Sequence, residues 1–185
     1  MSVKTPLITA AELDHFPDDG KRREIIAGEL YVSPAPAKEH QKLAGKLYLL
    51  LHQAVEFPGW GEVYFAPVDV RFSTHDQVQP DLLVIRQERR GIYRGNTVHE
   101  APDIVVEILS PSNRNYDEIE KARLYAEAGV PEYWILDPIT HVFRMLALVD
   151  GRHVPVTPED GFLHSTVVPG LVVDPTALFA SLSSE

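Results

Sequence analysis

The sequence predicts an α/β or α+β fold in which a central mixed sheet is flanked by helices and carries added β-hairpins. Strand-like apolar runs follow one another from residue 61 to residue 109, and hairpin-like runs return after residue 140. Between them, residues 103–137 read as strand, helix and strand, which predicts a parallel crossover with its helix over one face of the sheet. The chain contains no internal repeat and no low-complexity linker, so we expect one domain over residues 1–185.

The first third of the chain predicts a short helix, a hairpin and a longer helix. Thr9 is the expected N-cap of the short helix, and Glu12 completes a capping box. Two strands in residues 23–32 meet around Ala27-Gly28, as in a hairpin. The longer helix, residues 38–55, has an apolar stripe at 3.6-residue spacing.

The rest of the chain is predicted to consist mainly of strands. A charged, turn-rich surface loop covers residues 87–102. A helix over Tyr116–Ala128 has Asp117 as its N-cap, and a short helix, Pro175–Ser181, closes the chain. The predicted strands cover residues 61–66, 68–72, 79–86, 104–109, 132–137, 141–149, 152–156 and 162–168.

Composition and motifs exclude several classes of protein. The chain has no cysteine, which rules out a disulfide framework, a thiolate zinc site and a cysteine nucleophile. It also lacks the motifs of serine hydrolases, zinc proteases and phosphate-binding loops. The N-terminus has no signal-peptide pattern and no apolar run approaches the length of a membrane span, so we expect a cytoplasmic protein with no membrane partner.

The net charge of −10 argues against a protein that coats nucleic acid electrostatically. It does not exclude an enzyme acting on nucleic acid, because a local basic patch can act beside a metal ion. Two such patches are present, Lys21-Arg22-Arg23 and the four arginines between residues 86 and 94. If DNA is the substrate, we expect both patches to flank the site.

Two carboxylates interrupt strands that otherwise look fully buried. Alternate residues of a strand share a face, so Glu107 lies with Val105 and Leu109 in an apolar strand. Asp81 shares its face with Leu83 and Ile85 in the same way. Burial of an ionised carboxylate costs several kcal/mol unless the group is paired or bound to a metal. We therefore expect Asp81 and Glu107 to share a partner.

Lys121 lies on the apolar stripe of the following helix, with Leu124 and Tyr125 three and four residues on. It therefore faces the sheet that carries Glu107. The simplest interpretation is a buried Glu107–Lys121 salt bridge, or a lysine whose ammonium reaches the edge of the core. The three charges together favour a site, because two carboxylates from neighbouring strands form a hard ligand set for Mg²⁺ and a lysine can hold a phosphate or orient water.

These residues resemble the PD-(D/E)xK nuclease signature, in which Pro80-Asp81 is followed by an acidic residue such as Glu107 near the end of a buried strand. More closely, the chain resembles the Uma2 family of restriction endonucleases. The similar segments are REIIAGELYVSPAPAKEHQ, VQPDLLVIR, APDIVVEILSPSN, KARLYAEAGVPEYWILDP and VVPGLVVD. The resemblance implies a restriction-endonuclease-like fold over nearly the whole chain.

One position departs from the nuclease signature. The lysine expected two residues after Glu107 is replaced by Leu109. The Uma2 resemblance implies that the lysine has moved to the following helix, so that Lys121 replaces it. It also places Glu24 and His40 near the site, although Glu24 could simply pair with an arginine and His40 could be an ordinary inward-facing core residue.

We therefore predict an enzyme, a Mg²⁺- or Mn²⁺-dependent endonuclease acting on DNA. Asp81 and Glu107 are the metal ligands, and the catalytic set is Asp81, Glu107, Lys121, Glu24 and His40. Two alternatives stay open: a catalytically inactive nuclease fold that serves as a binding or scaffold module, and a hydrolase of a smaller phosphate ester. Asp103 follows Pro102 in a second Pro-Asp pair, but it lies roughly 13 Å along the strand from Glu107 and is not expected to share the metal.

Cleavage of both strands of a duplex requires two active sites, so we also expect a homodimer. The run in residues 141–149 is apolar on both strand faces. It could extend a sheet or pair across a two-fold axis, or it could lie within the core.

Overall fold

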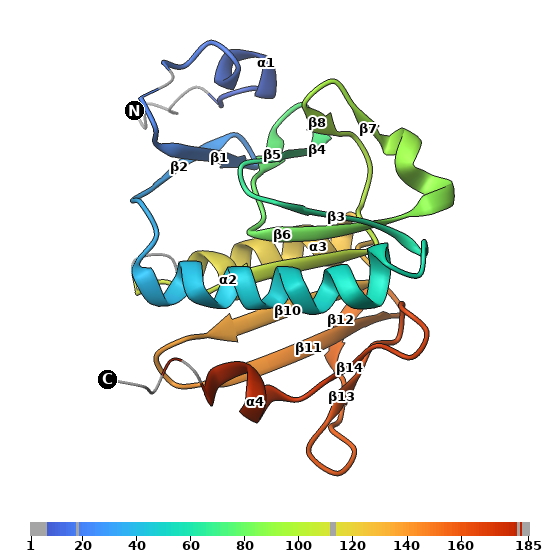
Figure 1. The fold of residues 1–185 in the computed structure, drawn as a ribbon. Helices are drawn as coiled ribbons and strands as arrows, with labels where there is room; N and C mark the ends of the chain where they lie inside the picture. Colours follow the sequence, from blue (N-terminus) through green and yellow to red (C-terminus); the bar gives the residue numbers. More distant parts are fainter. Residues whose placement is uncertain (1–6, 18, 112–113, 181, 183–185) are drawn as a thin grey trace.

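Two six-stranded sheets and a two-stranded hairpin form the framework of the computed structural model, which describes residues 7–17, 19–111, 114–180 and 182 (Figure 1). The central sheet is mixed, because β9 and β10 are parallel and every other neighbouring pair is antiparallel. The predicted central mixed sheet is therefore confirmed. Its strands, in spatial order, are β12 (Arg152–Pro155), β11 (Val142–Val149), β10 (Glu132–Asp137), β9 (Ile104–Ile108), β6 (Leu82–Arg86) and β3 (Gly61–Phe65).

The second sheet consists of short strands that the sequence predicted only in part. The hairpin around Ala27-Gly28 is confirmed, and its first strand also pairs with β5. Residues 87–102 were predicted as a loop, but they contain a 3₁₀ helix (Gln87–Ile92) and two short strands that join this sheet. In spatial order the strands are β2 (Glu29–Ser33), β1 (Arg22–Ile26), β5 (Asp76–Val78), β4 (Asp69–Ser73), β8 (Thr97–Val98) and β7 (Tyr93–Arg94).

The helices agree well with the predicted spans. α1 (Ala10–Leu13) has the capping box between Thr9 and Glu12, and α4 covers Pro175–Ala180. Ser181, predicted as the end of α4, lies outside the described residues. The other predicted helices each contain a π-helical segment: α2 (Lys38–Leu51) continues into η1 (His52–Glu56), and η3 (Tyr116–Lys121) leads into α3 (Ala122–Glu127).

Strand β9 separates two apolar cores, one on each face of the central sheet. Ile104, Val106 and Ile108 belong to the core that includes α2, whereas Val105 and Leu109 belong to the core that includes α3. Figure 1 shows α2 in front of the sheet and α3 behind it. All five residues of β9 are buried, so Glu107 enters the α3 core as its position in the alternation predicted.

The C-terminal part of the central sheet bears on the expected homodimer. β11 pairs with β10 over Val142–Ala147 on one side and with β12 over Leu146–Val149 on the other, so part of each hydrogen-bonding edge is used within the chain. Pairing of residues 141–149 with a second copy stays a prediction, with less free edge than the sequence suggested. The homodimer itself stays a prediction. No helix among the described residues is long and apolar enough to cross a membrane.

Candidate active site

The centre of the site is a guanidinium surrounded by three carboxylates. Arg22, the first residue of β1, places Nη1 2.8 Å from Asp81 Oδ1. Its Nη2 lies 3.1 Å from Glu24 Oε1 and 3.3 Å from Glu107 Oε2. Asp81 precedes β6 and Glu107 lies in the neighbouring strand β9. The two predicted metal ligands therefore face one common group.

A second cation, Lys121, shares Glu24 and Glu107 with Arg22 and is almost completely buried. Its ammonium is 2.8 Å from Glu107 Oε1, 2.9 Å from Glu24 Oε1 and 3.4 Å from Asp117 Oδ1. The Glu107–Lys121 contact predicted from the helical stripe is present, but the lysine is shared among three carboxylates. Lys121 therefore neutralises a group of three carboxylates and does not form a simple salt bridge with Glu107 alone.

Asp117 is not the N-cap that the sequence predicted for this helix. The N-cap of η3 is Asn115, whereas Asp117 lies within the helix with its side chain buried beside Lys121. The wider π-helical turn begins at Tyr116, one residue before the predicted cap. A residue four positions before Lys121 on such a turn can face the same core as the lysine.

Backbone amides and neighbouring side chains fix the orientation of each carboxylate. The Ile108 amide donates to Asp81 Oδ2 at 2.7 Å, and the Gln79 amide donates to Glu24 Oε1 at 2.7 Å. The Tyr125 hydroxyl donates to Glu107 Oε1 at 2.7 Å. Each side chain is held by an element next to its own strand, so the site depends on the sheet being assembled.

His40 extends from the first turn of α2 to the same group of residues. Its Nε2 lies 3.0 Å from Asp81 Oδ2. The five predicted site residues are thus brought together: Asp81, Glu24 and Glu107 contact Arg22, Lys121 contacts Glu24 and Glu107, and His40 contacts Asp81.

Burial and mutual repulsion control the protonation of the carboxylates. Burial raises the pKa of Glu107 to about 8 and outweighs the nearby charges of Lys121 and Arg22. Burial likewise raises the pKa of Asp117 to about 6. Burial also acts on Asp81, but the His40 hydrogen bond and the Arg22 charge hold its pKa below the usual range. The pKa of Lys121 is raised, because three carboxylates outweigh its burial and the repulsion of Arg22.

The chemistry of the site fits a divalent cation. When all four are ionised, Glu24, Asp81, Glu107 and Asp117 carry four negative charges against the two positive charges of Arg22 and Lys121, which leaves −2. Without a bound ion, the raised pKa of Glu107 lets a proton offset part of this charge at neutral pH. Carboxylate oxygens are the ligands that Mg²⁺ and Mn²⁺ prefer. Within the described part of the chain, no three acidic, histidine or cysteine side chains already form an open metal-binding group. Arg22 instead lies between the carboxylates.

Several buried polar atoms at the site lack a hydrogen-bond partner within the residues that the structure describes: Arg22 Nε, Glu24 Oε2 and the Tyr116 hydroxyl. Unsatisfied buried groups are rare in native proteins and are often explained by water, an ion or a ligand. All three belong to residues around the Lys121 ammonium, which lies 2.9 Å from Glu24 Oε1 and 5.3 Å from the centre of the Tyr116 ring, while Arg22 contacts the same Glu24 oxygen.

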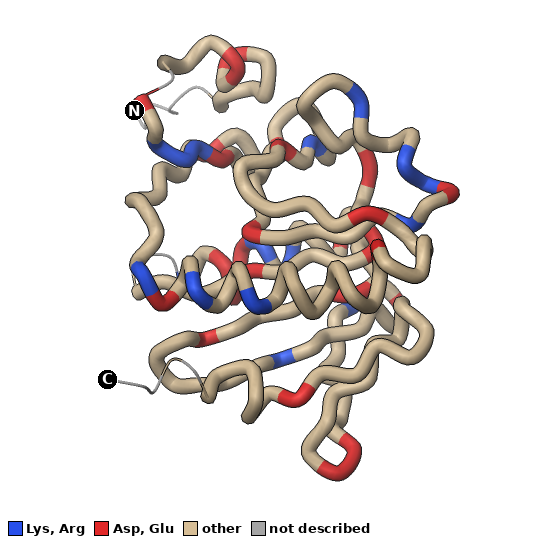
Figure 2. Tube along the Cα trace, viewed as in Figure 1, with Lys and Arg blue, Asp and Glu red and all other residues tan. Residues whose placement is uncertain are grey.

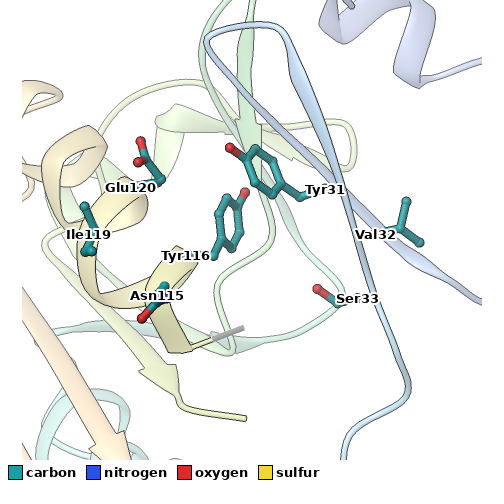
Figure 3. A pocket seen from close by; sticks show the side chains of 7 residues that line it. All are labelled: Tyr31, Val32, Ser33, Asn115, Tyr116, Ile119 and Glu120. Atoms are coloured by element: carbon teal, nitrogen blue, oxygen red, sulfur yellow. The ribbon is translucent and has the colours of Figure 1, made fainter. Parts of the chain in front are cut away.

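Tyr116 also lines a hollow of about 440 Å³ (Figure 3). Its aromatic wall is the Tyr31–Tyr116 pair, whose ring centres lie 4.0 Å apart in a stacked arrangement. Asn115 and Glu120 bring polar groups to the same hollow. The site therefore adjoins a solvent-accessible space lined by aromatic rings.

The second basic patch is not at the site, which corrects the expected placement. Arg86 is at the end of β6 opposite to Asp81, and it pairs with Asp103 at 2.7 Å. Arg89 also pairs with Asp103, at 3.0 Å. Five residues along a strand separate Arg86 from Asp81 by roughly 16 Å. Figure 2 shows the arginines of this loop across the molecule from the basic residues of β1 and of α2.

Asp103 is therefore a structural carboxylate. We expect Asp103→Asn to lower the free energy of unfolding by about 1–3 kcal/mol, because two arginines lose a buried charged acceptor. Thermal melting checks the loss of stability. Metal affinity should stay within about twofold of wild type, since the change lies at the far end of the sheet. A large change in metal affinity would contradict this assignment.

The role of Arg22 was not predicted from the sequence, in which this residue stood out only as part of a basic patch. The signal was present, because Arg22 and Glu24 are two residues apart and share a face of a predicted strand. Tyr125 and Asp117 were also not assigned to the site. Their contacts depend on how η3 and α3 pack on the sheet, which has no local sequence signature.

Comparison with known proteins agrees with this geometry. A family model named Uma2, whose description is "Putative restriction endonuclease", matches residues 10–176. The chain belongs to the Uma2 family. The match covers every side chain of the candidate site.

The fold of this Uma2 protein is similar to that of a solved structure from Anabaena variabilis ATCC 29413, described as a putative nuclease belonging to DUF820. The TM-score is 0.80 at 19% sequence identity, and the alignment covers 95% of this chain and 99% of that one. At this identity the likeness establishes the fold, and it confirms the predicted fold class. No curated protein matches the chain.

Proposed function

We propose that this Uma2 protein is a Mg²⁺- or Mn²⁺-dependent endonuclease that hydrolyses phosphodiester bonds in DNA. The observation that carries the proposal is the convergence of Asp81 and Glu107, from neighbouring strands, on one cation, with Lys121 2.8 Å from Glu107. A divalent ion held by Asp81 and Glu107 supplies a Lewis acid for the attacking water and the scissile phosphate. Family membership supports the same reaction class.

In this proposal Lys121 acts as an ammonium. Its pKa is raised, so at neutral pH it carries a positive charge and can donate hydrogen bonds to water or to a phosphate oxygen. It is therefore not the general base. Glu24 keeps this ammonium in position at 2.9 Å. His40 orients Asp81, one of the two residues that would hold the ion, through its contact with Oδ2.

Two features of the surroundings support a nucleic-acid substrate. In the hollow beside Tyr116, the partly exposed ring of Tyr31, which stacks on Tyr116, could bind a nucleobase without requiring a particular sequence. Lys38 and Lys42 are exposed on the first two turns of α2, the helix that carries His40 to the site. These exposed lysines can contact a phosphate backbone in place of the arginines of residues 86–94.

The alternative function is a scaffold with no catalytic activity, in which the charges form a structural network. It is favoured by the fact that Arg22 and Lys121 already contact every carboxylate of the cluster. Buried ion networks of this kind occur without catalysis.

A metal titration separates the two functions. In an endonuclease, Mn²⁺ at about 100 times its Kd should raise the stability by about 2.7 kcal/mol through binding to the folded state alone. Cleavage of a supercoiled plasmid should depend on the added ion and stop with EDTA. Asp81→Asn should abolish both effects, whereas Glu127→Gln, on the exposed side of α3, should retain them. If neither Mn²⁺ nor Mg²⁺ changes the melting temperature of the wild-type protein or allows it to cleave the plasmid, the scaffold function is the one that remains.

A further inference from the structure

Arg22 occupies the position that a shared metal ion requires. Asp81 Oδ1 and Glu107 Oε2 are the oxygens that turn toward a common partner, and both contact the Arg22 guanidinium. The other oxygens of these carboxylates are already used: Asp81 Oδ2 by Ile108 and His40, and Glu107 Oε1 by Lys121 and Tyr125. An ion that binds both carboxylates therefore needs the oxygens that Arg22 now holds.

A guanidinium and a divalent cation compete for these oxygens, because their like charges repel when both lie against the same carboxylates. Arg22 is also the more exposed of the two cations that contact Glu107. Its side chain is 22% exposed, whereas that of Lys121 is 1% exposed and enclosed by Tyr116 and the carboxylates. In addition, Arg22 Nε has no partner among the described residues, so the side chain is anchored only through its two Nη atoms.

We propose that Arg22 is the counter-ion of the metal-free site and that a divalent ion displaces it from Asp81 and Glu107. This inference rests on the proposed metal site. Without the ion, Arg22 offsets the repulsion between three buried carboxylates and keeps Asp81 and Glu107 oriented toward one point. With the ion, the guanidinium leaves these two residues. It can keep its contact with Glu24, two residues along the same face of β1. Arg22 is thus a positioning residue that competes with the metal.

The first test measures Mn²⁺ affinity by electron paramagnetic resonance on wild type, Arg22→Gln and Arg22→Lys. We expect Arg22→Gln to bind Mn²⁺ at least about tenfold more tightly, because no cation must be displaced, a coupling of ordinary size for two linked binding events. Arg22→Lys should lie between the two, since it keeps the charge but lacks the planar fork through which the guanidinium contacts Asp81 and Glu107 with separate nitrogens. In the absence of metal, Arg22→Gln should melt at a lower temperature than wild type.

Lys38→Gln is the matched control for loss of a positive charge near the site. Lys38 is in the first turn of α2, two residues before His40, and its side chain is exposed. Its replacement should change Mn²⁺ affinity by less than about twofold, because exposed charges are well screened. An equal gain in affinity for Lys38→Gln and Arg22→Gln would overturn direct competition.

The second test follows the guanidinium itself in the wild-type protein and needs no variant. With ¹⁵N-labelled arginine, the Arg22 side-chain signals should shift or broaden as Mg²⁺ saturates the site, while those of Arg86, which pairs with Asp103, stay unchanged. Arg22 signals that do not respond at Mg²⁺ saturation would overturn the inference.

The outcomes keep the inference and the proposed function apart. If wild type binds Mn²⁺ and Arg22→Gln binds it no more tightly, the displacement is wrong and the metal site stands. If Arg22→Gln binds Mn²⁺ where wild type does not, the competition is supported in its strongest form. If none of the proteins binds Mn²⁺ or Mg²⁺, both the metal-dependent function and the inference fail.

Discussion

Lys121→Met is expected to lower the free energy of unfolding at pH 7 by about 3–5 kcal/mol, the usual cost of removing one partner from a buried ion pair. The side chain is 1% exposed and contacts Glu24, Glu107 and Asp117. Methionine fills much of the same volume, so the loss of packing is small and the loss of charge dominates. Three buried carboxylates would then share Arg22 as their remaining neighbouring cation among the described residues.

Denaturant unfolding and thermal melting measure this loss directly. Lys42→Met is the matched control, because Lys42 is exposed on α2, and a surface change of this kind costs less than about 0.5 kcal/mol. A Lys121→Met protein as stable as the Lys42→Met protein would mean that the lysine does not neutralise the carboxylates. Nuclease activity should also be lost, since the ammonium that contacts the water or the phosphate is absent.

Glu107→Gln is expected to abolish metal-induced stabilisation and to reduce any phosphodiesterase activity by more than about 100-fold. Substitution of a residue that hydrogen-bonds to a metal ligand already lowers metal affinity or activity by about 10–100-fold, and loss of the ligand itself has a larger effect. Glutamine keeps the shape and can still accept from the Tyr125 hydroxyl. The stability of the metal-free protein should stay unchanged or rise.

The expected stability follows from the number of partners at the site. Without the Glu107 charge, Lys121 keeps Glu24 and Asp117, and Arg22 keeps Glu24 and Asp81. No cation is left unpaired, and one source of repulsion among the carboxylates is removed. If Glu107 were instead the essential partner of Lys121, the variant would melt several degrees lower and the wild type would ignore Mn²⁺. Melting curves of both proteins, with and without Mn²⁺, separate these results, with Glu127→Gln as the control.

Local periodicity explains why several site residues could be predicted from the sequence. The period of two in a strand assigned Glu107 to the face of Val105 and Leu109, and the structure places the two apolar residues in the α3 core. The helical period assigned Lys121 to the stripe of Leu124 and Tyr125. Both predictions depend only on residues within one element, so they survive without knowledge of the rest of the fold.

Predictions that involved pairing between distant segments were less successful. The run in residues 141–149 was considered for pairing with a second copy, but β10 and β12 take up part of both its edges within the chain. The arginines of residues 86–94 were expected beside Asp81, yet β6 carries them to the opposite end of the sheet. The order and direction of the strands decide both outcomes, and the residues of a single segment predict neither the order nor the direction.

The sequence by itself determined that Glu107 and Lys121 face a common core, because strand and helix periods orient each side chain and a buried charge must find a partner. Only the tertiary structure decided which partners they find. The contact of Arg22 with Asp81 and Glu107 joins residues 59 and 85 positions apart. It exists because β1 of the second sheet comes next to the ends of β6 and β9. Such a contact depends on the packing of two sheets, for which a single strand carries no local signal.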